Sequence, residues 1–193
     1  MPTVRLATSD DVAHLATTAT RAFADDPLMR WLVPDDAEYF ADIPQLVADR
    51  CRRWQATQSQ WCTDDGVAFA GWVPPGRPDA DVARSAMVHP PHRLVKFEAL
   101  RVAFAEHTPR EPHWYLNMLA THPDWQRQGL GAALMGEVFE IADPEGLPCY
   151  LETETAANVA YYRHHGFEVR SEWDLATEHE RGPHLWGMLR SAV

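Results

Sequence analysis

The spacing of apolar positions changes from a strand pattern to a helical one within the first part of the chain. Residues 3–8 alternate in polarity, which predicts a short strand, and the polar run 8–11 is typical of a helix start. A second helical pattern covers residues 37–58, and Pro27 and Pro34 are expected to break the segment between the two helices. Apolar residues on one face define the first helix: Val12, Leu15, Ala16, Ala19 and Phe23.

The remaining sequence alternates predicted strands and helices. Residues 60–76 predict a hairpin with a turn at Asp65-Gly66, and residues 78–106 predict a helix interrupted at Pro90-Pro91. Further strands are expected at 113–121, 148–154, 167–175 and 184–190, with helices opening after Gly129 and at Asn158. This order predicts an α/β (α+β) protein with a mixed sheet, in a single domain covering residues 1–193.

Composition narrows the classes of partner. The 193 residues are 46% hydrophobic, enough for a full core, but no apolar run is long enough for a membrane span. The formal net charge of −11 disfavours binding to nucleic acid and favours cationic partners such as amines. The N-terminus lacks a secretory signal pattern, and three scattered cysteines form no disulfide framework, so a cytoplasmic location is expected.

The segment from Gln126 to Gly131, Gln-Arg-Gln-Gly-Leu-Gly, is the strongest candidate for a ligand site. It opens a helix, and a helix N-terminus presents unpaired amide groups and a positive dipole to an anion such as phosphate. A P-loop is excluded because Ala132 follows where Lys is required. A dinucleotide fingerprint is a weak alternative, because Leu134 stands where a third glycine is expected.

Two motifs in order resemble the GCN5-related N-acetyltransferases (the GNAT family). The first is the Gln126–Gly131 segment, which matches the family's pyrophosphate loop. The second is the stretch 151–169, where Asn158 and Tyr162 precede Gly166-Phe167 at the family's spacing. The resemblance implies a mixed, mostly antiparallel central sheet with helices on both faces. It also implies acetyl-CoA as the donor and transfer of an acetyl group to a primary amine.

The resemblance also assigns roles to individual residues. Tyr162 is the expected general acid, which protonates the leaving thiolate, and neighbouring Tyr161 is expected to pack. Asn158 is expected to hydrogen-bond the pantetheine arm or to cap its helix. The expected cofactor contacts are strand backbone groups at Leu119, Ala120 and Thr121 and the loop residues Arg127, Gln128, Gly129, Leu130, Gly131 and Ala132.

The general base is less well defined by sequence. Tyr150, Glu152 and Glu154 share one face of a predicted strand, and Glu152 is the leading candidate. Glu154 is expected to be a solvated or salt-bridged carboxylate, and His113 and His122 are weaker candidates. The adjacent histidines 164 and 165 have no partner at a ligand spacing, so no metal is expected.

The acceptor side is expected near residues 23–36, where Asp25, Asp26 and Trp31 combine carboxylates with an aromatic ring. Such a surface suits a small, cationic, amphipathic amine, as in family members that acetylate antibiotics. Two alternatives remain open: acetylation of a protein N-terminus or lysine, and a non-catalytic acyl-CoA-binding module. The sequence does not distinguish a monomer from a homodimer.

Overall fold

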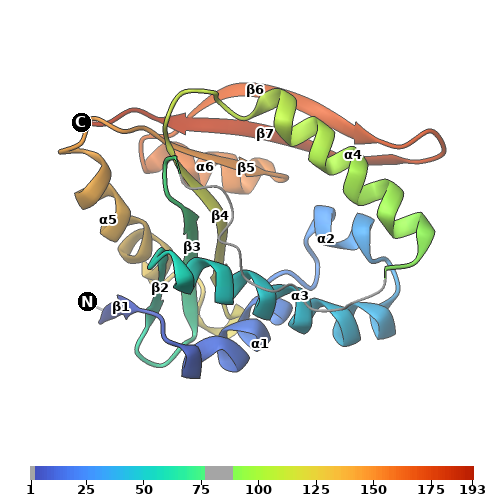
Figure 1. Cartoon of the computed structure of the whole chain (residues 1–193), viewed down its shortest axis with the longest axis horizontal. Helices are drawn as coiled ribbons and strands as arrows, with labels where there is room; N and C mark the ends of the chain where they lie inside the picture. Colours follow the sequence, from blue (N-terminus) through green and yellow to red (C-terminus); the bar gives the residue numbers. More distant parts are fainter. Residues whose placement is uncertain (1–2, 77–88) are drawn as a thin grey trace.

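The computed structural model describes residues 3–76 and 89–193, which form one seven-stranded sheet with helices packed against it (Figure 1). The strand order is β1-β2-β3-β4-β5-β7-β6, and every neighbouring pair is antiparallel except β4 and β5. The predicted fold class is therefore confirmed. The strands are β1 (Val4–Leu6), β2 (Gln60–Thr63), β3 (Ala68–Val73), β4 (Trp114–Thr121), β5 (Cys149–Thr153), β6 (Glu168–Ala176) and β7 (Arg181–Arg190).

The helices agree with the sequence pattern except near prolines. The observed helices are α1 (Val12–Ala22), α2 (Pro27–Leu32), α3 (Asp36–Ala56), α4 (Pro91–His107), α5 (Leu130–Ala142) and α6 (Ala156–His164), with short 3₁₀ turns at Ser9–Asp11 and Pro123–Trp125. Helix α2 was not expected, because Pro27 had been predicted to break a helix and instead begins one. Proline lacks only an amide that is unpaired in the first turn anyway, and the Asp26 side chain caps the helix. The predicted helix before Pro90 lies outside the described residues.

Alternation along the strands separates two apolar cores. Cys62 and Phe69 pack with α1 and α3 on one face of the sheet, whereas Trp61, Ala68 and Ala70 pack with α5 on the other. Successive strand residues point to opposite faces, so each central strand contributes to both cores. Helix α4 lies across the end of the sheet beside β6 (Figure 1).

Candidate active site

Strands β4 and β5 pair only at their beginnings. The register joins Trp114 to Cys149 and Tyr115 to Tyr150, although β4 continues to Thr121. On its other side β4 stays paired with β3 through Thr121. The later part of β4, which contains Leu119, Ala120 and Thr121, therefore faces the β5 side without a strand partner. An extended amide-containing chain is the kind of ligand that adds to such an edge.

The loop before α5 has the backbone geometry of an anion site. Gly129 is the N-cap of α5 with φ 79°, and Arg127 also has a positive φ of 61°, which is uncommon for a non-glycine residue. The amides of Leu130, Gly131 and Ala132 occupy the first turn, where a helix supplies no acceptors. A Cβ on Gly129 would meet no atom within 4 Å, so this side of the loop is open to a ligand. These features fit a pyrophosphate group.

The loop lies directly beside the end of β4 and the helix α6. A Cβ placed on Gly131 would come within 2.6 Å of the Tyr161 hydroxyl and 3.4 Å of a Leu119 methyl carbon. Glycine at position 131 therefore permits the close approach of α6 and β4 to the loop. The loop, the unpaired strand edge and α6 thus form one continuous surface.

The two adjacent tyrosines of α6 have different environments. Tyr162 lines a mostly apolar pocket that Glu152 also lines, and its ring packs edge-on against Phe167 at 5.7 Å between centroids. Burial is the main cause that raises the pKa of Tyr162, and the nearby Tyr161 and Glu154 add smaller contributions. The Tyr162 hydroxyl therefore retains the proton that an acid must donate. Tyr161 is 37% exposed and does not line this pocket.

Asn158 does not cap α6, contrary to one of the two expectations. The helix begins two residues before Asn158, and its N-cap is Thr155, whose hydroxyl accepts the Asn158 amide proton at 3.1 Å. Threonine serves as an N-cap in the same way as asparagine, so the sequence pattern allowed either residue. The Asn158 side chain is left exposed at the pocket, as contact with a pantetheine arm requires.

Glu152 lines the same pocket and is half-buried. Burial raises the pKa of Glu152 to about 7, and the surrounding hydroxyls of Tyr115, Tyr150 and Thr108 partly offset this effect. The Thr108 hydroxyl donates a hydrogen bond to the carboxylate over 3.3 Å. A carboxyl group with a pKa near neutrality is matched to general-base chemistry. Neither His113 nor His122, the weaker candidates, lines this pocket.

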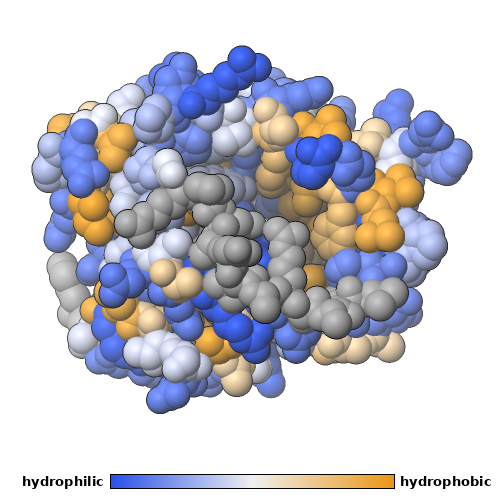
Figure 2. All heavy atoms as spheres, in the orientation of Figure 1, coloured by the Kyte–Doolittle hydropathy of each residue, from blue (hydrophilic) through white to orange (hydrophobic). Residues whose placement is uncertain are grey.

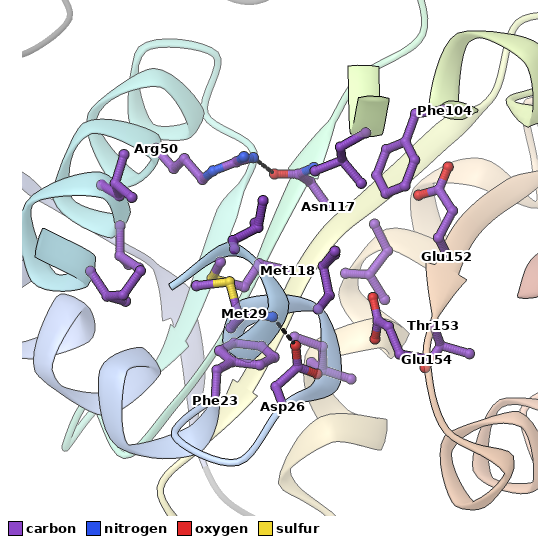
Figure 3. Close-up of a pocket in the computed structure, with 18 of the residues that line it drawn as sticks. Phe23, Asp26, Met29, Arg50, Phe104, Asn117, Met118, Glu152, Thr153 and Glu154 are labelled. Atoms are coloured by element: carbon purple, nitrogen blue, oxygen red, sulfur yellow. Dashed lines mark hydrogen bonds between the residues drawn. The ribbon is translucent and has the colours of Figure 1, made fainter. Parts of the chain in front are cut away.

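The pocket that contains Glu152 and Tyr162 is lined mainly by apolar side chains. Figure 2 shows apolar atoms gathered in a hollow between α4 and the α2–α3 region, and Figure 3 shows the lining in detail. The polar exceptions include Arg50, which donates a hydrogen bond of 2.5 Å to the Asn117 side chain. Apolar side chains from α1 to α4 include Phe23, Leu28, Met29, Leu32, Phe97, Leu100 and Phe104.

The predicted acceptor residues occupy different places. Asp26 lines the pocket, but Asp25 and Trp31 do not. Trp31 is 7% exposed and packs in the core, where its carbonyl oxygen accepts a hydrogen bond of 2.6 Å from Lys96. Asp26 is the N-cap of α2 and Asp25 lies before it, whereas Trp31 belongs to the helix face that packs in the core.

Several lining residues were absent from the sequence prediction. The face of α4 that carries Phe97, Leu100 and Phe104 has helical spacing, so a signal existed. Arg50 and Asn117 gave no such signal, because they come from α3 and β4 and meet only in the folded chain.

Within residues 3–76 and 89–193, no cluster of three or more histidine, cysteine, aspartate or glutamate side chains is arranged to hold a metal ion. Over the same ranges, no helix has the length and apolar character needed to cross a membrane.

Comparison with known proteins identifies the family. Residues 26–167 match the acetyltransferase (GNAT) family, and the chain therefore belongs to it. Acetyl-CoA is the donor that acetyltransferases of this family use. Over 75 residues, 38% of this chain, the sequence is 33% identical to an uncharacterised N-acetyltransferase of Schizosaccharomyces pombe, and the match spans only 30% of that relative.

Solved structures share the fold. The structure of histone acetyltransferase HPA2 and related acetyltransferase from Corynebacterium glutamicum superposes with a TM-score of 0.70 at 22% identity, covering 100% of this chain and 97% of that one. The PaiA N-acetyltransferase from Thermoplasma acidophilum, solved in complex with coenzyme A, has a TM-score of 0.58 at 12% identity, with 99% of each chain covered.

Proposed function

We propose that this enzyme acetylates the primary amine of a small, amphipathic, cationic molecule by direct transfer from acetyl-CoA in a ternary complex. The observation that carries this proposal is the pocket itself. Glu152 and Tyr162 both line it, and the rest of its wall is largely apolar with a few acidic groups. Such a lining suits an amine attached to an apolar body.

The donor side uses the open edge of β4 and the loop before α5. The pantetheine arm pairs with the backbone of Leu119, Ala120 and Thr121 and contacts Asn158, and the pyrophosphate binds at the amides of residues 127–132. This placement brings the thioester into the gap between β4 and β5, beside Tyr162. The role of the protein here is to orient the thioester carbonyl toward the acceptor pocket.

The two side chains divide the proton transfers. The acceptor arrives as an ammonium ion, and Glu152 removes one proton so that the nitrogen lone pair attacks the thioester carbonyl carbon. The tetrahedral intermediate collapses as the carbon–sulfur bond breaks, and Tyr162 donates its proton to the departing thiolate. The new amide nitrogen loses its second proton, and the tyrosinate is reprotonated. The sum is acetyl-CoA plus ammonium giving amide, coenzyme A thiol and one proton.

Puromycin is the first acceptor to test. Sequence stretches at residues 2–12, 22–27, 111–131, 150–169 and 182–190 resemble puromycin N-acetyltransferase in order, whereas residues 29–109 match only loosely. The resemblance has departures near the proposed acid, because Ala160 and Tyr161 replace a proline and a phenylalanine of that enzyme. The proposal of an antibiotic acceptor, and of a role in resistance, therefore rests on the matching stretches outside residues 29–109.

A thiol-release assay with a panel of amines tests this function. The panel contains puromycin, 2-phenylethylamine and a short peptide with a free N-terminus, each at equal concentration with acetyl-CoA. We expect kcat/KM for the better small amine to exceed that for the peptide by at least about tenfold, equivalent to roughly 1.4 kcal/mol. Faster acetylation of the peptide than of every small amine would establish a protein acetyltransferase instead. Absence of thiol release with all acceptors, despite acetyl-CoA binding, would favour a non-catalytic module.

A further inference from the structure

Two carboxylates enter the pocket from opposite walls. Asp26 comes from the start of α2 and Glu154 from the residue after β5, and both line the cavity. Figure 3 shows their carboxyl groups turned toward each other at one end of the pocket, with Glu152 farther along the same strand. Glu154, which the sequence predicted to be a solvated or salt-bridged carboxylate, lines the pocket.

Neither carboxylate has a cationic partner among the described residues. Asp26 accepts the Met29 amide proton at 2.9 Å, which satisfies one of its two oxygens. The nearest arginine of α2, Arg30, instead pairs with Asp36 at 2.8 Å. Within the described ranges no cation pairs with Glu154, and its carboxylate accepts a hydrogen bond from its own backbone amide. Two anionic groups in an apolar cavity without a counter-ion are costly, because each loses hydration and repels the other.

The electrostatics of the pair support the geometry. Burial raises the pKa of Glu154 well above its usual range, and the nearby Asp26 and Glu152 add to that effect. Burial likewise raises the pKa of Asp26, although hydrogen bonds from the backbone amides of α2 act in the opposite direction and lower it. A bound cation would relieve both costs at once, since it compensates the charge and supplies hydrogen-bond donors.

We propose that Asp26 and Glu154 together bind the ammonium group of the acceptor, and that the site thereby selects a primary amine on a compact apolar or aromatic body. This inference rests on the proposed function and names its substrate class. The apolar body packs against Phe23 and Met29, which lie beside Asp26 in the pocket (Figure 3). Tyr162 lines the same pocket as Asp26 and Glu154, so an ammonium held by this pair shares the pocket with the proposed acid.

Binding to the enzyme loaded with coenzyme A tests the pair without requiring turnover. The probes are 2-phenylethylamine and the similarly shaped 2-phenylethanol, measured by calorimetry or ligand-observed NMR. We expect the wild-type enzyme to bind the amine at least about tenfold more tightly, the magnitude of charged hydrogen bonds. We expect Asp26→Asn and Glu154→Gln each to reduce that preference to about threefold or less, because each removes one carboxylate.

The controls separate recognition from folding. Asn is as good an N-cap as Asp, so Asp26→Asn preserves the start of α2. Glu140→Gln removes an exposed carboxylate of α5 that does not line the pocket, and it should keep the wild-type preference. Equal binding of amine and alcohol by the wild-type enzyme, or an unchanged preference in both pocket variants, would overturn the proposal.

The two proposals fail in different ways. If the enzyme prefers the amine in the binding test but acetylates no small amine, the ammonium site is supported and the proposed function is wrong. If the enzyme acetylates small amines but binds the amine no more tightly than the alcohol, the proposed function is supported and the role of the Asp26–Glu154 pair is wrong.

Discussion

The donor side and the acceptor side of this enzyme are built by different means. The donor side consists of the end of β4, the loop before α5 and the start of α6, and it offers mainly backbone groups. The acceptor side is a pocket whose side chains come from α2, α3, α4, the earlier part of β4, β5 and Tyr162 of α6, with Phe23 from the turn after α1. Backbone amides bind any pyrophosphate or pantetheine in the same way, whereas side chains determine which amine fits.

This difference separates what a family shares from what one member selects. Short contiguous motifs encode the donor side, because its geometry depends on a positive φ at Gly129 and a close approach at Gly131. The acceptor side depends on residues that are distant in sequence, such as Arg50 and Asn117. Substitutions on the donor side and at the reacting groups should therefore affect every acceptor equally, and substitutions in the pocket should not.

The largest effect is expected at the boundary between the two sides. Tyr162→Phe keeps the ring packed against Phe167 and removes only the hydroxyl. We expect kcat to fall by about 10²–10⁴-fold for all acceptors, the usual contribution of a positioned acid, with little change in acetyl-CoA affinity. Steady-state kinetics combined with calorimetry of acetyl-CoA binding measures both quantities.

The neighbouring tyrosine provides the matched control. Tyr161→Phe also removes one hydroxyl from α6, but from a side chain outside the pocket, and should leave kcat within about threefold of wild type. A large loss in Tyr161→Phe with an unchanged Tyr162→Phe would exchange the two roles. A lowered melting temperature in Tyr162→Phe, without a kinetic defect, would make Tyr162 a packing residue.

Particular residues show what the sequence allowed and what it did not. The hairpin at Asp65-Gly66 and the helix after Gly129 were predictable, because turn residues and apolar spacing act locally. Helix α2 and the Thr155 cap were missed, because proline and threonine each permit more than one helix boundary. The place of Glu154 in the pocket lining was missed because strand alternation predicts which residues share a face, but not which helices cover it.

Glu152 should make the acetylation rate depend on pH. Burial holds its pKa at about 7, and a general base must be ionised, so activity should rise as pH increases through 7. We expect kcat/KM for the amine to increase with an apparent pKa near 7. Glu152→Gln should lower kcat by about 10²-fold at pH 8 and flatten this part of the profile.

The pH profile also tests which carboxylate acts as the base. If the rise near pH 7 persists in Glu152→Gln and disappears in Glu154→Gln, the base is Glu154. The acceptor's own ionisation is separated by repeating the profile with two amines of different pKa, because only a group of the enzyme gives the same midpoint with both.

The smallest expected effect isolates the donor side. Gly129 has a positive φ and open space where a Cβ would lie, so the loop can accept a small side chain that tolerates this conformation. Gly129→Asp and Gly129→Asn add side chains of nearly equal shape, but only aspartate adds a negative charge beside the pyrophosphate. Both side chains enter the space left open to the ligand, so both variants should bind acetyl-CoA more weakly than wild type. We expect the aspartate variant to bind at least about tenfold more weakly than the asparagine variant, roughly 1.4 kcal/mol, because only aspartate adds a negative charge. Calorimetry at low and high salt measures this loss, and screening should reduce the difference between the variants. Equal affinities for aspartate and asparagine, with both proteins folded, would mean that the pyrophosphate does not bind at this loop.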